Sequence, residues 1–316
     1  MKVVLLSPWL NAWVPLYRAA YEARGHEFMH CKTDLAPHAD IYLHAWATGD
    51  TTPRYGSKNY VFMRRYELFA GGLRKVKWKA MDGLVVVNSW IKGVVEEAFK
   101  HNGVTTPVHL IYNGTDLSRW RFKLRRPGNR VAMACHIHPK KNLPLALQIL
   151  AALPEDYQLH IAGEVQDACT AEYLNDVAIK MRRSLILYGH IEHSDLSRWW
   201  DDMDYCLSTS ISEGNPNNVI EAAAKGIKPV VHSWPGAEDQ FAPYTFNTVA
   251  EAVAQITAPE YDSNEYRGMV LDKFSLANIE RVVDLTLGES HEGAARDGSG
   301  SAVDGAAGAQ SEQACA

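Results

Sequence analysis

Short apolar runs alternate along the chain with segments in which apolar residues recur every three or four positions. The runs are rich in Val, Ile and Leu and are bounded by polar residues, which is typical of buried strands. They lie at residues 3–6, 40–46, 59–63, 84–90, 108–111, 131–135, 159–164, 185–191, 205–208 and 228–232. Regular alternation of such strands with helices predicts an α/β protein built on parallel sheets that helices cover.

Several segments between or after these runs predict helices. They lie at residues 16–23, 143–150, 195–202, 216–225, 249–256, 264–274 and 276–287. Thr248 and Glu251 form the pattern of a capping box. In the helix at 216–225, Asn215 is the expected N-cap and Pro216 suits the first helical position. Gly226 lies where a left-handed C-terminal cap is expected.

Length and composition predict two domains of ordinary size. The chain has 316 residues, of which 47% are hydrophobic and 22% charged, as in soluble globular proteins. We expect a first domain at residues 1–118 and a second at 119–261, joined by a connection at 119–129. The tail at 289–316 is rich in Gly, Ala and Ser and is expected to be disordered.

The cysteines indicate a reducing compartment. Their number is odd and their spacing fits neither a metal site nor a disulfide framework: Cys31, Cys135, Cys169, Cys206 and Cys315. The first eight residues predict a strand rather than a secretion signal, and no apolar run is long enough to span a membrane. We therefore expect a cytoplasmic protein.

Charge is distributed unevenly. Residues 1–127 have a formal charge of +9 and the remainder −14. This asymmetry predicts that the first half meets an anionic partner, and solvated helix faces are the alternative. The densest basic run surrounds Trp78 and consists of Arg74, Lys75, Lys77 and Lys79. A basic helix with an aromatic residue lies on an anionic membrane, as a peripheral protein would, or tracks a nucleic-acid backbone.

The most informative stretch is Ser212-Glu213-Gly214-Asn215-Pro216-Asn217 with the helix that follows it. It connects two predicted strands, so it forms the crossover of a βαβ unit. A helix that starts after a parallel strand favours phosphate, because its free amides and its macrodipole attract negative charge. Glu213 precedes this helix and Glu221 lies within it. Alternatively, Glu213 is a solvated loop charge and Glu221 forms an ordinary i,i+4 pair with Lys225.

The pattern Glu213-Gly214-x-Pro216-Asn217-x-x-x-Glu221, followed by Gly226 and Pro229-Val230-Val231, resembles the donor-site signature of the retaining glycosyltransferases of family 4. The resemblance extends over residues 1 to about 288. It implies the GT-B fold, in which two Rossmann-like domains with parallel sheets face each other across a cleft. It also implies a C-terminal helix, within about 262–288, that returns to the first domain. The implied reaction transfers a sugar from a nucleotide-sugar to a hydroxyl with the anomeric configuration retained.

The resemblance also implies roles for residues of the second domain. Glu213 would bind hydroxyls of the transferred sugar, Glu221 the ribose hydroxyls, and Lys141 the diphosphate. His136 stands where the family has an arginine, so its positive charge depends on protonation. Backbone groups of the Gly-x-Pro-Asn segment, Gly214, Asn215, Pro216 and Asn217, would contact the sugar and the diphosphate. Those of the loop after the strand at 185–191, Tyr188, Gly189 and His190, would contact the base.

Fewer residues of the first domain have implied roles. His44 ends a predicted strand, and in the family a histidine near this place approaches the donor sugar, so we expect it beside Glu213 in the catalytic centre. Arg64, Arg65 and Glu67 follow another strand. Charged residues at a strand end are not expected in a core, and these would bind an acceptor phosphate or form surface ion pairs. The segment Asn113-Gly114-x-Asp116 resembles the family's turn at the end of the first domain.

No metal, cofactor or stable protein partner is expected. Lys141 and the helix amides are able to neutralise a leaving diphosphate, and Cys135, His136 and His138 lack the separated pairs typical of metal sites. The acceptor candidates are a phosphate-bearing lipid or glycan and a hydroxymethylated DNA base. Two alternatives remain for the function: a nucleotide-sugar epimerase of the same fold, and a non-catalytic protein that binds nucleic acid or membranes.

Overall fold

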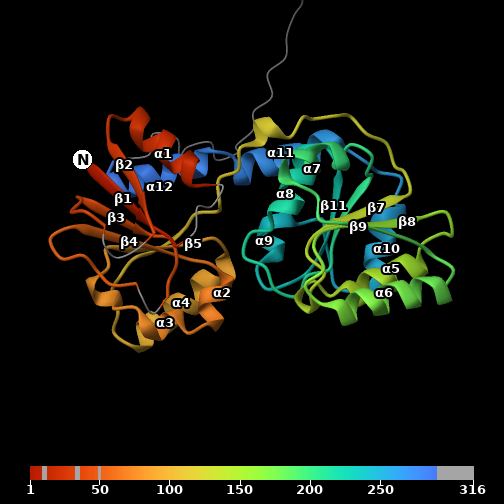
Figure 1. Cartoon of the computed structure of the whole chain (residues 1–316), viewed down its shortest axis with the longest axis horizontal. Helices are drawn as coiled ribbons and strands as arrows, with labels where there is room; N and C mark the ends of the chain where they lie inside the picture. Colours follow the sequence, from red (N-terminus) through yellow and green to blue (C-terminus); the bar gives the residue numbers. More distant parts are fainter. Residues whose placement is uncertain (9–12, 33–35, 49–50, 290–316) are drawn as a thin grey trace, which may run out of the picture.

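The computed structural model of the protein describes residues 1–8, 13–32, 36–48 and 51–289. Apart from Glu289, the predicted tail at 289–316 lies outside these residues. Figure 1 shows two α/β bodies side by side. Their helices are α1 Val14–Ala23, α2 Arg65–Phe69, α3 Gly72–Lys75, α4 Ser89–His101, α5 Leu143–Ala152, α6 Ala168–Lys180, α7 His193–Trp200, α8 Asn217–Ala224, α9 Ala237–Phe241, α10 Val249–Thr257, α11 Ser263–Phe274 and α12 Ala277–Leu287.

Each domain is built on a six-stranded sheet in which neighbouring strands are parallel. The first sheet has the order β2 Glu27–Cys31, β1 Lys2–Leu6, β3 Ile41–His44, β4 Lys58–Met63, β5 Gly83–Val86, β6 Val108–Leu110. The second has the order β12 Thr245–Phe246, β11 Lys228–His232, β10 Tyr205–Ser208, β7 Arg130–Ala134, β8 Gln158–Ala162, β9 Ser184–Gly189. In both sheets the order reverses beside the first strand of the domain, and the crevice at such a point is where open α/β sheets bind ligands.

The last helix returns to the first domain, as the family resemblance implies. In Figure 1, α12 lies beside α1. Its buried residues Ile279, Val282 and Val283 belong to the hydrophobic core that contains Val3 and Tyr17. The returning segment is shorter than expected, because Val270 and Phe274 of α11 pack in the core of the second domain. Residues 263–274 therefore complete the second domain, and only α12 crosses back.

The two domains touch through a polar contact near the start of α8. Gln240 of α9 is fully buried, and its Nε2 donates to the carbonyl oxygens of Gly214 at 2.7 Å and of Val87 at 3.3 Å. Asn88, which caps α4, also donates to Pro235 O at 3.5 Å. One side chain thus joins the end of β5 to the loop that carries Glu213.

Candidate active site

A pocket of about 410 Å³ lies in the second domain at the carboxyl ends of β7, β8 and β10 and the start of α8, and we call it the second-domain pocket. Its size is that of a small-molecule site. It is lined by Ala134, Cys135, His136, Lys141, Ala162, Gly163, His190, Ile191, His193, Leu196, Glu213, Asn215, Pro216, Asn217 and Asn218. The structure thus brings together most of the predicted donor-binding residues.

Lys141 and Glu213 form an ion pair inside this pocket. Lys141 Nζ lies 2.6 Å from Glu213 Oε1, and Lys140 Nζ lies 4.0 Å from the other carboxylate oxygen. The loop that carries the lysines is held to the end of β10, because Thr209 Oγ1 donates to Lys141 O at 2.7 Å and the Ile211 amide donates to Lys140 O. Burial lowers the pKa of Lys140, and the charge of Glu213 opposes this shift. Lys140 is a second cation that the sequence did not single out.

Glu221 is buried and paired with His193. His193 Nε2 lies 3.1 Å from Glu221 Oε1, and the carboxylate side chain is 8% exposed. Burial raises the pKa of Glu221, while the hydrogen bond with Glu221 raises that of His193. The alternative i,i+4 pair of Glu221 with Lys225 is wrong. Lys225 Nζ instead contacts Asp201 Oδ1 at 3.0 Å, and so Glu221 faces the site rather than its helix neighbour.

The first turn of α8 differs from the prediction. Pro216 is the N-cap and α8 begins at Asn217, so Asn215 does not cap the helix. Both polar atoms of the Asn215 side chain are buried, and neither has a hydrogen-bond partner among the described residues. At the other end, Gly226 has φ +81°, as expected of a left-handed C-cap. The amides at the start of α8 face the second-domain pocket, where they favour an anion.

The other predicted donor contacts are only partly assembled. His136 lines the pocket, with its ring half exposed and its Nδ1 3.9 Å from Glu164. His190 also lines it, beside Glu192. Tyr188 does not, because its hydroxyl bonds His160 Nδ1 at 2.8 Å and its ring packs on Trp199.

Two glycines shape this part of the pocket. Gly189 accepts a hydrogen bond from the Gly163 amide at 2.7 Å. Gly163 has φ +155°, and a Cβ atom there would lie 2.0 Å from Cys135 O. The sequence signal for Gly163 is a glycine near the end of the predicted run at 159–164, but the sequence assigns it no role.

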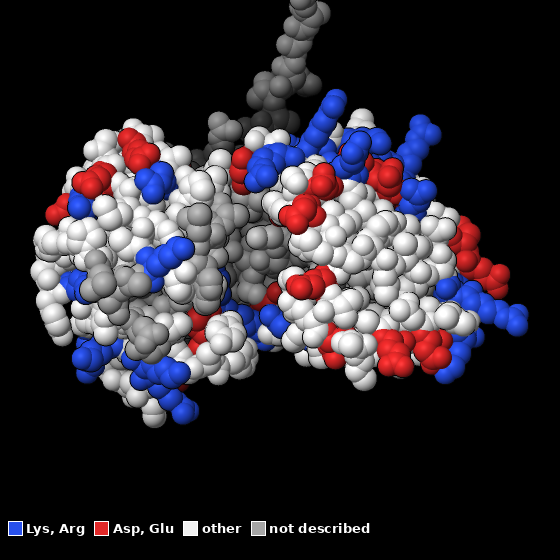
Figure 2. Space-filling model, viewed as in Figure 1, with Lys and Arg blue, Asp and Glu red and all other residues white. Residues whose placement is uncertain are grey.

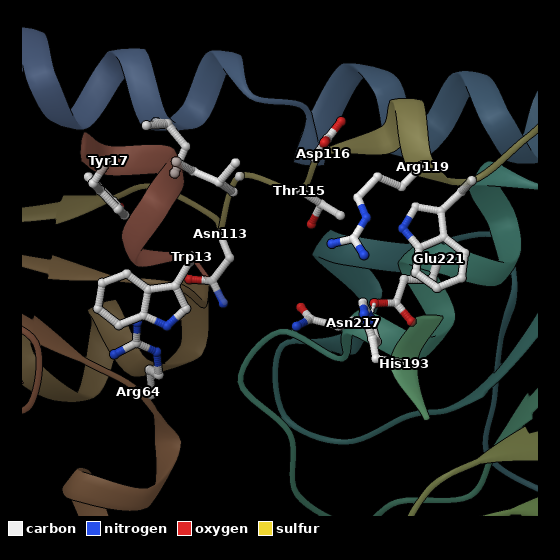
Figure 3. A pocket seen from close by; sticks show the side chains of 14 residues that line it. Trp13, Tyr17, Arg64, Asn113, Thr115, Asp116, Arg119, His193, Asn217 and Glu221 are labelled. Carbon is white, nitrogen blue, oxygen red and sulfur yellow. Dashed lines mark hydrogen bonds and ion pairs between the residues drawn. The ribbon is translucent and has the colours of Figure 1, made fainter. Parts of the chain in front are cut away.

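A second cavity, of about 140 Å³, lies between the domains, and we call it the interdomain pocket (Figure 3). Trp13, Tyr17 and Arg64 of the first domain form one wall, and Arg119, His193, Asn217 and Glu221 of the second form the other. Asn113, Thr115 and Asp116 lie between the two walls. His193 and Asn217 line both pockets, so the two cavities adjoin at the start of α7 and α8.

Arg64 is held between aromatic rings at this pocket. Its guanidinium carbon lies 5.2 Å from the ring centre of Trp13 and 4.8 Å from that of Trp46, and its Nη1 donates to Ala45 O at 2.8 Å. Burial lowers the pKa of Arg64, while the charge of Glu67 opposes this shift. Rings and carbonyl together fix the plane of the guanidinium.

Arg65 and Glu67 are buried, so the expectation that charged residues after β4 stay out of the interior is wrong for both. Arg65 reaches across to the second domain, where its Nε donates to Ser212 Oγ and its Nη1 to Pro235 O, while its guanidinium stacks on Trp90. Glu67 is fully buried, and it accepts a hydrogen bond from the Arg64 amide at the start of α2. Burial raises the pKa of Glu67.

The basic run lies away from both pockets. Arg74, Lys75, Lys77 and Lys79 are all exposed on and after α3, at the lower left of Figures 1 and 2. Trp78 is not presented with them, because it is 5% exposed, packs against Phe99 and donates its indole N–H to Leu73 O. The basic residues are thus presented to solvent without Trp78, which the sequence groups with them.

His44 is also set back from the cavities. It is 4% exposed at the end of β3, and its Nε2 lies 3.2 Å from Asn59 Oδ1. His44 does not line either pocket. Trp46, two residues later, contacts Arg64 instead.

The site residues that sequence reasoning missed lie mostly at the interdomain pocket. They come from the start of α1, the 113–116 turn, the interdomain connection and α7: Trp13, Tyr17, Asn113, Thr115, Arg119, Trp120 and His193. Of these, only the turn had a sequence signal, as part of the Asn113-Gly114-x-Asp116 pattern. Gly114 allows the turn to approach α12, since a Cβ atom there would lie 2.6 Å from Ile279 Cγ1.

Within the described residues, no group of three or more His, Cys, Asp or Glu side chains is arranged to hold a metal ion. No helix in the same part of the chain is long and apolar enough to cross a bilayer.

Residues 128–261 match the family model described as Glycosyl transferases group 1. No curated protein matches the sequence. Among solved structures, Anabaena HepE in complex with UDP and glucose is 13% identical with a TM-score of 0.69, covering 91% of this chain and 99% of that chain.

Two further structures agree. Sucrose-phosphate synthase from Thermosynechococcus elongatus is 14% identical with a TM-score of 0.69, covering 91% of this chain and 98% of that chain. A glycosyltransferase from Rickettsia africae is 12% identical with a TM-score of 0.68, covering 92% and 99%. These likenesses confirm the predicted GT-B fold. The chain thus has the GT-B fold, and its residues 128–261 are similar to the group 1 glycosyl transferases.

Proposed function

We propose that this enzyme transfers a sugar from a nucleotide-sugar to a hydroxyl of an anionic acceptor and retains the anomeric configuration. The observation that carries the proposal is the composition of the second-domain pocket. A half-buried Lys141–Glu213 pair, three asparagine carboxamides and the start of α8 meet there at the carboxyl ends of parallel strands. This set offers cations and amides for a diphosphate and a carboxylate for sugar hydroxyls.

We assign the two glutamates the roles that the family resemblance implies, and their positions support this assignment. Glu213 lies in the loop before α8, beside the lysines, and binds hydroxyls of the transferred sugar. Glu221 lies one to two turns further along α8 and binds the ribose. His193 holds its carboxylate in place through the 3.1 Å hydrogen bond. HepE, which has the same fold, was crystallised with UDP and with UDP-glucose, which supports a nucleotide-sugar as the donor here.

The chemical step needs little from the protein beyond placement. The acceptor oxygen forms a bond to the anomeric carbon while the bond from that carbon to the diphosphate oxygen breaks. The bonding pair leaves with the diphosphate, and a phosphate oxygen takes the hydroxyl proton. Lys141 and the α8 amides stabilise the added charge, so the step is proposed to proceed without a metal. The donor and acceptor must be aligned for this same-face attack.

The acceptor enters through the interdomain pocket. An anionic acceptor is favoured by the positive balance of the first half of the chain and by Arg64 at the pocket wall. A phosphate-bearing lipid or glycan and a hydroxymethylated DNA base both have such chemistry. The named product of one similar structure, a sucrose-phosphate synthase, carries a phosphate. Free thiols at Cys31, Cys135 and Cys206 favour a reducing compartment such as the cytoplasm.

The decisive experiment is a nucleotide-release screen with UDP-, GDP-, ADP- and TDP-sugars, followed by mass spectrometry of the candidate acceptors. We expect one donor class to release nucleoside diphosphate only when an acceptor is present. Glu221→Ala should weaken the binding of free nucleoside diphosphate by roughly 1.5–3 kcal/mol, as expected when a hydrogen bond to a charged group is lost. If the protein binds no nucleoside diphosphate and releases none from any donor, the proposal is wrong. Formation of an epimerised donor without acceptor would identify an epimerase, and binding of nucleic acid or vesicles without turnover a non-catalytic protein.

A further inference from the structure

We propose that the first-domain wall of the interdomain pocket binds a sugar that carries an acidic group, a carboxylate or a phosphate monoester, and that Arg64 pairs with this group. The inference rests on the proposed function, because it names the acceptor for the same reaction. It assigns recognition of the acceptor's charge to Arg64, a cation of the pocket's first-domain wall, and not to the surface basic run.

The charge of Arg64 is not neutralised within the described residues. No carboxylate oxygen of these residues lies within 4.0 Å of its guanidinium nitrogens, and the single hydrogen bond that its side chain makes to them is the one to Ala45 O. A guanidinium has five N–H groups, so most of them remain for a ligand. The carboxylate of Glu67, which bonds the Arg64 backbone amide, acts on the charge from a longer distance.

The surroundings of Arg64 make an anion favourable there. The rings of Trp13 and Trp46 both lie against the guanidinium and shield it from water, which is costly for a charge without a counter-ion. The same rings hold the guanidinium in one plane, and a fixed fork pairs bidentately with carboxylate or phosphate oxygens. An acidic group that enters the pocket can therefore bind the guanidinium N–H groups, which need little further ordering.

The rest of the wall is suited to a sugar ring. Trp13 and Tyr17 offer aromatic surface, and the side chains of Asn113 and Thr115 make no hydrogen bond to another described residue. Aromatic walls with a few polar groups are typical of sites that enclose a small ligand, and the amide and hydroxyl are able to bond its hydroxyls. Glu221 and Asn217, which are assigned to the donor, form the opposite wall, so a sugar in this pocket lies beside the bound donor.

The exposed cations of α3 fit this role less well. Arg74, Lys75, Lys77 and Lys79 face solvent outside the pocket, where salt at physiological strength screens a charge beyond about 8 Å. They would attract many anions without selecting one. Only an enclosed cation next to the donor discriminates between an acidic and a neutral acceptor of the same shape.

The test compares matched acceptors in the full-length enzyme. One pair is a methyl glucuronide against the methyl glucoside, and the other is glucose 6-phosphate against glucose, so the two pairs distinguish a carboxylate from a phosphate. We expect the parent enzyme to favour the acidic member of one pair. Arg64→Gln should raise the KM for that member by about 10- to 100-fold and change the KM for the neutral member by less than about 3-fold, the size of effect expected for one charged hydrogen-bonded contact.

Three controls make the outcome decisive. Arg18→Gln removes one positive charge from the same domain, at a residue that pairs with Glu22 and Phe28 O outside the pocket, and should leave the acid preference unchanged. Calorimetry with free nucleoside diphosphate shows whether Arg64→Gln is folded. If it is not, Arg64→Lys keeps a charge without the fork and should lose part of the preference.

Two results would overturn the inference. If Arg64→Gln raises the KM for acidic and for neutral acceptors by the same factor, Arg64 only supports the tryptophans. A parent enzyme that binds nucleoside diphosphate and glycosylates only neutral acceptors would refute the acidic acceptor while leaving the proposed function intact. A parent that binds no diphosphate refutes the proposed function itself.

Discussion

Lys141 Nζ lies 2.6 Å from Glu213 Oε1, so the two residues assigned to the diphosphate and to the sugar are bonded to each other. With the proposed roles, a bound donor competes for both groups, because its phosphate interacts with the cation and its hydroxyls with the carboxylate. Any weakening of the Lys141–Glu213 pair on binding would lower the affinity for the nucleotide alone. Lys140, at 4.0 Å, is the nearest charge left to Glu213.

Glu213→Gln should keep or increase the affinity for free nucleoside diphosphate and reduce kcat with the complete donor. The substitution frees Lys141 for phosphate, but it replaces a strong acceptor of sugar hydroxyl hydrogen bonds with a weaker one. Calorimetry with the diphosphate and initial rates with the donor separate the two effects. Lys141→Met is the opposite case and should weaken the binding of free nucleoside diphosphate by about 1.5–3 kcal/mol. Equal weakening by both substitutions would contradict the assigned roles.

The contribution of His193 to stability should depend on pH. Its hydrogen bond with Glu221 raises the pKa of His193 above 6.5, so the folded protein binds this proton more tightly than the unfolded chain. That stabilisation is complete below pH 6.5 and is lost as the pH rises through the raised pKa. The melting temperature of the parent should exceed that of His193→Gln most at pH 6, and the difference should shrink toward pH 8.5. In a Glu221→Gln background the pH dependence of the difference should disappear; if it persists, another group is responsible.

Gly163→Ala should destabilise the second domain by about 2 kcal/mol or more. The new Cβ atom would lie 2.0 Å from the backbone oxygen of Cys135, at a φ of +155° that other residues rarely adopt. Gly93 provides the control, because it lies in α4 and no atom lies within 4 Å of the position that a methyl group would take there. Gly93→Ala should raise stability by about 0.5–1 kcal/mol. Urea unfolding of both variants measures the contrast, and a neutral Gly163→Ala would show that the β8 turn is free to move.

Gln240→Ala should loosen the contact between the domains. The fully buried amide bonds Gly214 O and Val87 O, so its loss leaves two carbonyl groups without this donor. We expect a larger radius of gyration in X-ray scattering and a higher donor KM. Gln255 is a matched amide that bonds Thr245 O within the second domain. Gln255→Ala should lower stability without changing the radius of gyration, and an unchanged radius in Gln240→Ala would contradict the bridging role.

The sequence predicts the sheets well because most of their strands are continuous apolar runs. It misses β2, in which only Phe28 is fully buried, and α6, in which only Leu174 and Ala178 are buried. Neither segment buries enough apolar side chains to produce a clear periodicity.

For the site, the contiguous motif from Glu213 to Glu221 identifies the second-domain pocket, since its geometry is local to one loop and one helix. The interdomain pocket is assembled from residues as far apart as Trp13, Asn113 and His193, which no spacing rule connects. The burial of Arg65 and Glu67 is also not predictable from the sequence, because both are charged residues at a strand end. The second domain and α2 enclose them in the folded protein. Long-range packing decides these positions.

The crossing of α12 has a consequence for the order in which the chain folds. The first domain lacks Ile279, Val282, Val283 and Leu287 until α12 has left the ribosome, and these side chains fill the face of its sheet beside α1. The second domain, at residues 130–274, has its own core by then. During synthesis the first domain therefore waits for α12, which is made after the second domain.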